Sequence, residues 1–135
     1  MSAKRFLDTN VLIYAFAEGD AKANVAEAAL ADGGTISVQV LNEFAHVCSR
    51  KLKLSWAEIE ERLSVVKMLL EEVTPITLPL HEKAVALAHT HKFSIYDALI
   101  IAAAHSAGCT VLLSEDLQHG RIIEGLRIEN PFQIA

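Results

Sequence analysis

The segment FLDTNVLIYA, residues 6–15, sets a carboxylate, a hydroxyl and an amide inside an otherwise apolar run. The pattern predicts a short strand over residues 5–7 and a turn of helix over residues 11–16, with Asp8, Thr9 and Asn10 at the junction. Burying an unpaired carboxylate costs on the order of several kcal/mol, comparable with the stability margin of a small domain. We therefore expect Asp8 at the carboxyl end of a strand, where another group compensates its charge.

Short strands and helices alternate along the rest of the chain. Strands are predicted over residues 35–38, 73–78, 110–113 and 126–128, and helices over residues 20–31, 40–50, 55–72, 79–91 and 94–108. Parallel strands need connections that pack back on the sheet, and helices provide them. The sequence therefore predicts an α/β fold in three layers, with a mostly parallel central sheet flanked by helices.

Composition favours one globular domain over residues 1–135, because 52% of the residues are hydrophobic and neither a repeat nor a linker interrupts the chain. The net charge of −5 argues against an extended surface that coats nucleic acid. Cys48 and Cys109 lie in apolar sequence, which fits reduced thiols and predicts a cytoplasmic protein. The apolar run at residues 98–104 is too short to span a bilayer, so we expect no membrane anchor.

Four acidic residues adjoin strongly apolar sequence, whereas most other acids lie on polar helix faces or in loops. They are Asp8, Glu43, Asp97 and Asp116. Functional groups of open α/β sheets gather beyond the carboxyl ends of the strands, where Asp8 and Asp116 fall. Four carboxylates in one pocket would repel by about 1 to 4 kcal/mol per close pair, and this repulsion requires a hard cation. Ligation by oxygen alone favours Mg²⁺ or Mn²⁺.

Each acid taken singly also has a purely structural explanation. Asp8 and Asp116 can cap helices or stabilise turns. Asp97 fits a Ser94-x-x-Asp97 capping box, and Glu43 fits a salt bridge on the flank of a helix. The case for a metal site therefore depends on the four acids together.

Four motifs in order, FLDTNVLIYA, LNEF, SIYDALIIAAA and LLSEDLQHG, resemble the PIN-domain family, especially VapC-like ribonuclease toxins, over nearly the whole chain. The resemblance implies that Asp8, Glu43, Asp97 and Asp116 hold the divalent metal and carry catalysis. It also implies that three neighbouring residues orient these ligands or position water: Thr9, Asn10 and Ser114.

The same resemblance implies metal-dependent hydrolysis of RNA to products with a 5′-phosphate and a 3′-hydroxyl. It also implies a protein antitoxin as partner and a homodimer. Arg50, near the end of the helix that carries Glu43, and Arg121, beyond Asp116, are candidate phosphate contacts. Ordinary solvated surface explains these two arginines equally well.

Two other classes of function remain open at this point. A Mg²⁺-dependent phosphoacceptor receiver also places acids at strand ends, but such a domain keeps a lysine at a late strand end, where this chain has the acids of VLLSED. A PIN-like module that binds RNA or protein without cleavage shares the expected fold. A test for metal-dependent turnover separates the two, because an enzyme cleaves RNA and such a module does not.

Overall fold

The structure is a computed structural model and describes residues 3–133. Within them the chain forms, in order, β1 (Arg5–Leu7), α1 (Thr9–Ala15), α2 (Ala21–Ala31), β2 (Thr35–Ser37), α3 (Val38–Arg50), α4 (Trp56–Leu69), β3 (Glu72–Thr74), α5 (Leu78–His91), α6 (Ile95–Ser106), β4 (Val111–Leu113), β5 (Ile122–Ile123) and β6 (Leu126–Glu129). The strands make one sheet in the order β3-β2-β1-β4-β6-β5. Every neighbouring pair is parallel except β5 and β6.

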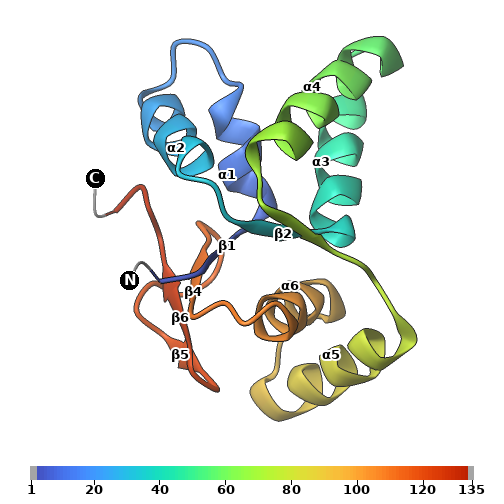
Figure 1. The fold of residues 1–135 in the computed structure, drawn as a ribbon, viewed down its shortest axis with the longest axis vertical. Helices are drawn as coiled ribbons and strands as arrows, with labels where there is room; N and C mark the ends of the chain where they lie inside the picture. Colours follow the sequence, from blue (N-terminus) through green and yellow to red (C-terminus); the bar gives the residue numbers. More distant parts are fainter. Residues whose placement is uncertain (1–2, 134–135) are drawn as a thin grey trace.

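Helices cover both faces of this sheet (Figure 1). The first four helices lie on one face, and α5 and α6 lie on the other. The run Ala98–Ala104 of α6 is buried all round, as expected of a central helix. The three-layer α/β prediction is therefore confirmed. Among residues 3–133, no helix combines the length and apolar character needed to cross a membrane.

Strand order fixes where a ligand can bind. From β1 the chain moves outward through β2 to β3, and later returns to pair β4 with the other side of β1. The carboxyl ends of β1 and β4 therefore lie at the point where the strand order reverses. Such a point leaves a crevice between the diverging connections, which is where open α/β sheets bind ligands.

Local chemistry explains why these elements start where they do. Asp20 caps α2, and Ser55 with Glu58 forms the predicted capping box of α4. The first helix begins at Thr9, two residues earlier than predicted, because Asp8 caps it. Capping side chains therefore determine where these three helices begin.

Two predicted elements end earlier than expected, and one strand was not predicted. The strand predicted over residues 73–78 ends at Thr74, since Pro75 has no N–H to donate to the ladder and Thr77 already caps α5. The helix predicted to residue 72 ends at Leu69. The two-residue strand β5 was not predicted, and it joins β6 through a turn at Glu124 and Gly125, which both have positive φ.

Candidate metal centre

A cleft of about 590 Å³ opens at the carboxyl edge of the sheet, beside the point where the strand order reverses. Its lining brings together all four acids singled out in the sequence, although these acids come from β1, α3, α6 and the loop after β4. Six of the seven residues predicted for the site line it: Asp8, Thr9, Asn10, Glu43, Asp97 and Asp116. The seventh, Ser114, is buried and hydrogen-bonds to Asp8.

Asp8 is the most enclosed of the four acids, with 7% of its surface exposed. Its Oδ1 accepts from the backbone N–H of Thr9 at 2.7 Å, and its Oδ2 accepts from the Ser114 hydroxyl at 2.8 Å. Burial raises the pKa of Asp8 to about 6, although these two bonds oppose the shift, and the charges of Glu43 and Asp116 raise it further. Asp8 is thus a helix cap whose charge two neutral donors compensate only in part.

Glu43 is held in the cleft by two neutral side chains. Thr9 donates its hydroxyl to Oε2 at 2.7 Å, and Gln39 donates its amide to Oε1 at 3.0 Å. Ser37, the last residue of β2, caps α3 and so starts the helix directly at the sheet edge. The ion pairs formed within residues 3–133 do not include Glu43, so the salt bridge considered from the sequence is not formed there.

Asp97 enters the cleft from the first turn of α6. Its backbone N–H donates to the capping hydroxyl of Ser94 at 3.2 Å, which is one of the two hydrogen bonds of the predicted capping box. Partial burial raises the pKa of the Asp97 carboxyl, the Ser94 hydroxyl opposes this, and the charges of Asp116 and Glu43 raise it further. The position in the cleft and these charges together place Asp97 within the same acidic group.

Asp116 is exposed on the irregular loop after β4, and its Oδ2 accepts from the side-chain amide of Asn10 at 2.7 Å. Three donors therefore each hold one acid: Ser114 holds Asp8, Thr9 holds Glu43, and Asn10 holds Asp116. These three donors are the residues to which the resemblance assigned the positioning of ligands or water, and that role stays a prediction. They restrain three carboxylates without neutralising any of them.

Oxygen-only donors with excess negative charge fit a hard divalent cation such as Mg²⁺ or Mn²⁺. The chemical type of these side chains fits such an ion, but their present spacing does not. Across residues 3–133, no three His, Cys, Asp or Glu side chains stand close enough together to grip a metal ion as they are. Mutual repulsion between the carboxylates favours such separation.

The two candidate phosphate contacts differ in position. Arg50 is exposed in the last turn of α3, seven residues after Glu43, and this spacing places both on one side of the helix. Arg121 is outside the lining of the cleft, and its guanidinium lies over the Phe93 ring at 4.6 Å from the centroid.

The outer part of the cleft contains side chains that the sequence analysis did not select. Gln39, His46 and Val47 lie four residues before and three and four residues after Glu43, so one helical face carries them all. Tyr96, which is 61% exposed, precedes Asp97. Helical spacing from Glu43 was the signal that could have found the first three, and the full outer lining is Gln39, Asn42, His46, Val47 and Tyr96.

The family model described as PIN domain matches residues 5–124. A toxin–antitoxin complex from Klebsiella pneumoniae has a similar fold, with a TM-score of 0.70, 26% identity, and coverage of 96% of this chain and 98% of that chain. DNA-bound VapBC from Salmonella typhimurium gives a TM-score of 0.63 and 25% identity over 95% of this chain and 98% of that one. VapC20 of Mycobacterium tuberculosis, a sarcin–ricin loop cleaving toxin, shares the fold with a TM-score of 0.70, at 21% identity over 84% of this chain and 90% of that one. No curated protein sequence matches the chain.

Proposed function

The chain belongs to the PIN domain family, and on this basis we propose that it is a divalent-metal-dependent endoribonuclease that hydrolyses RNA phosphodiester bonds. The observation that carries the proposal is the group of four carboxylates that share one cleft and are held only by neutral donors. Capping accounts for Asp8 singly but does not explain why four carboxylates share one cleft, where their charges destabilise one another. A bound cation makes it favourable.

In this mechanism Asp8, Glu43, Asp97 and Asp116 would hold the metal. A metal held by these residues would supply a water of lowered pKa and would neutralise charge on the phosphate oxygens. Ser114 and Thr9 keep the carboxylates of Asp8 and Glu43 in fixed orientations before substrate arrives. Water then attacks phosphorus directly, so we expect a 5′-phosphate and a 3′-hydroxyl on the products and no covalent enzyme intermediate.

The RNA would approach along the outer cleft. Asn42, His46 and Tyr96 line its wall, and Arg50 stands one helical turn beyond His46. An arginine in this position can attract a phosphate that neighbours the scissile one, while exposed polar and aromatic side chains can contact unpaired bases. Arg121 would act at greater distance from the acids, because it already stacks on Phe93.

We further propose that the protein is the cytoplasmic toxin of a toxin–antitoxin pair, bound by a protein antitoxin and forming a homodimer. Two of the similar structures support the antitoxin partner: the Klebsiella pneumoniae complex is named as toxin–antitoxin, and the Salmonella typhimurium structure is named as VapBC. An RNA-binding or interaction module without turnover is the second candidate, because the acids do not form a closed ligand shell within residues 3–133. Because the chain matches the PIN domain family, we do not propose a phosphoacceptor receiver domain.

Incubation of the purified protein with defined single-stranded RNAs tests the proposal. Cleavage should require added Mg²⁺ or Mn²⁺, should stop in excess chelator, and should be absent in Asp116→Asn. Binding of RNA with no cleavage under any metal condition would favour the second candidate. Equal cleavage in chelator would contradict the metal mechanism.

A further inference from the structure

The loop after β4 supplies two parts of the candidate metal centre, although no regular backbone structure extends through it. Ser114 is buried and donates to Asp8, while Asp116 is exposed and faces the cleft. Between them, Glu115 turns its side chain away from the acids. Because Glu115 and Asp116 are consecutive residues in a bend, a contact that holds the Glu115 side chain also restrains the backbone that carries Asp116.

Glu115 is held by α1 and α2. Its carboxylate forms an ion pair with Lys22, and it accepts from the Tyr14 hydroxyl at 3.3 Å. The Glu115 side chain is only 22% exposed, so these contacts are partly shielded from water. Lys22 also donates to the Tyr14 hydroxyl at 3.4 Å, which closes a three-membered network.

Two aromatic rings enclose the Lys22 ammonium. Its Nζ lies 4.8 Å from the ring centroid of Tyr14 and 5.4 Å from that of Phe132. The two rings pack edge to face at 5.1 Å. An ammonium held by a carboxylate, a hydroxyl and two ring faces has few directions in which to move. Four contacts therefore restrain the Lys22 ammonium.

We propose that Lys22 is a positioning residue for the metal centre: together with Tyr14 it anchors Glu115 and thereby turns Asp116, instead of Glu115, toward the cleft. This role rests on the proposed function. Without Lys22, the loop would carry two adjacent, unpaired carboxylates beside three further acids. Repulsion would then displace the loop, and Glu115 would compete with Asp116 for the cation.

A simple structural role would look different. An ion pair this close to the surface contributes little to stability, and its loss would change the melting temperature by a similar amount with and without metal. A positioning role instead changes metal affinity and turnover, because ligand orientation is sensitive to small displacements. The two roles are therefore separable by measurement.

The test compares Lys22→Met, Lys22→Arg, Glu115→Ala and the double variant Lys22→Met/Glu115→Gln in the full chain. Arg5→Met is the matched control, because it breaks an ion pair of 3.2 Å with Asp32 on the far edge of the sheet. Mn²⁺ affinity is measured by calorimetry without RNA, turnover by RNA cleavage, and folding by melting in chelator.

Lys22→Met should weaken Mn²⁺ binding and lower kcat by about ten-fold each, the usual effect of losing a group that orients a ligand. Lys22→Arg should recover most of this loss, since it restores the positive charge beside Glu115. The double variant should recover part of it, because the glutamine amide at position 115 carries no charge that competes for the ion. Arg5→Met should leave both quantities unchanged.

Equal Mn²⁺ affinity and kcat in Lys22→Met and wild type would overturn the positioning role while leaving the metal mechanism intact. A wild type that binds no Mn²⁺ would overturn the proposed function and the positioning role together. Should Lys22→Met fail to fold, Glu115→Ala decides, because it leaves no side-chain oxygen for Lys22 and Tyr14 to hold, and wild-type Mn²⁺ affinity in that variant would show that the anchor does not orient Asp116.

Discussion

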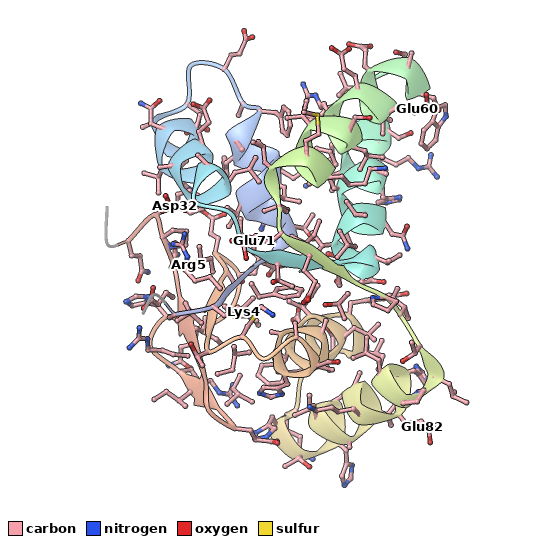
Figure 2. The ribbon with its side chains drawn as sticks, viewed as in Figure 1. Lys4, Arg5, Asp32, Glu60, Glu71 and Glu82 are labelled. Atoms are coloured by element: carbon pink, nitrogen blue, oxygen red, sulfur yellow. The ribbon has the colours of Figure 1, made fainter. Side chains whose placement is uncertain are left out.

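Acidic residues gather at both edges of the sheet, but their partners differ. At the amino edge, where the strands begin, a hollow of about 310 Å³ contains acids beside cations. Arg5 pairs with Asp32 at 3.2 Å, and Lys4 with Glu72 at 3.5 Å; Figure 2 labels Lys4, Arg5 and Asp32 in this region. At the carboxyl edge, the ion pairs within residues 3–133 include none of the four cleft acids.

The acids of the two edges also differ in their exposure to solvent. The Asp32 side chain is 69% exposed, so water and salt screen its pair with Arg5. Asp8 is buried, and the pKa of its carboxyl rises because burial outweighs the two hydrogen bonds that it accepts. The acids Asp32 and Glu72 of the amino edge are thus paired with cations, whereas the four acids of the cleft are not. An acid without a cationic partner is a better candidate for metal binding than an acid that already forms an ion pair.

Replacing one acid at each edge by asparagine should give the largest difference in RNA cleavage. We expect Asp8→Asn to lower cleavage by about 10³-fold, near 4 kcal/mol of lost transition-state stabilisation. Asp32→Asn should change cleavage by less than about two-fold, because a screened surface pair is not part of the reaction. Single-turnover cleavage of one RNA measures both variants. Near-wild-type cleavage by Asp8→Asn would show that the acid of the carboxyl edge is no more important for the reaction than the acid of the amino edge.

The pH dependence of stability without metal tests the burial of Asp8. The pKa of Asp8 is raised from 3.8 to about 6 in the folded protein, so between these values the native state binds more protons than the unfolded chain. Stability in chelator should therefore fall as pH rises through this window, by up to about 3 kcal/mol from this group, and the loss should vanish below pH 3.8.

Denaturant unfolding from about pH 4 to about pH 7 measures this slope, with Asp8→Asn as the control that lacks the titrating group. The difference in unfolding free energy between wild type and variant should grow in favour of the variant as pH rises. An unchanged difference across the window would show that Asp8 is already compensated without metal.

Metal should reverse that ranking. At about 100 times the dissociation constant, a cation that binds only the native state stabilises it by about 2.7 kcal/mol. Wild type should gain this amount with Mg²⁺ or Mn²⁺, and Asp8→Asn should gain much less. Asparagine caps helices as well as aspartate does, so Asp8→Asn keeps the start of α1, whereas Asp8→Ala should be about 1 kcal/mol less stable than Asp8→Asn with or without metal.

Melting wild type, Asp8→Asn and Asp8→Ala in chelator and in metal therefore separates the two roles of this residue. Equal metal-induced stabilisation of wild type and Asp8→Asn would mean that Asp8 only caps α1. Asp32→Asn should gain as much from metal as the wild type, because the amino edge does not contact the cleft.

What the sequence could predict follows from how local each signal is. Asp8 and Asp116 follow short apolar runs, so their places at strand ends can be read directly, and parallel pairing brings those ends together. The caps at Asp20, Ser55 and Ser94 are equally local, because each depends on a few consecutive residues. These signals predicted the fold class and the four acids in the cleft.

The rest depends on contacts between residues far apart in the chain. Thr9 meets Glu43 only because α1 and α3 pack together, and Lys22 meets Glu115 across 93 positions. The strand β5 has two residues, too few for a periodic pattern. No local pattern encodes such pairings, so the sequence identified the acids without showing what holds each of them or what directs the loop of Asp116.

The smallest expected effect concerns the two arginines, which the sequence treated alike. Arg50 stands on the side of α3 that carries Glu43, so Arg50→Ala should weaken RNA binding and reduce the slope of log affinity against log salt by about one. Arg121 already lies over Phe93 outside the cleft lining, so Arg121→Ala should reduce the slope less. Arg5→Ala, at the amino edge, should leave it unchanged. Binding of a short RNA to the catalytically disabled Asp116→Asn protein, across a range of salt, gives all three slopes. A larger loss in Arg121→Ala than in Arg50→Ala would redirect the RNA path from α3 toward β5, because each phosphate contact contributes to the slope where the RNA actually lies.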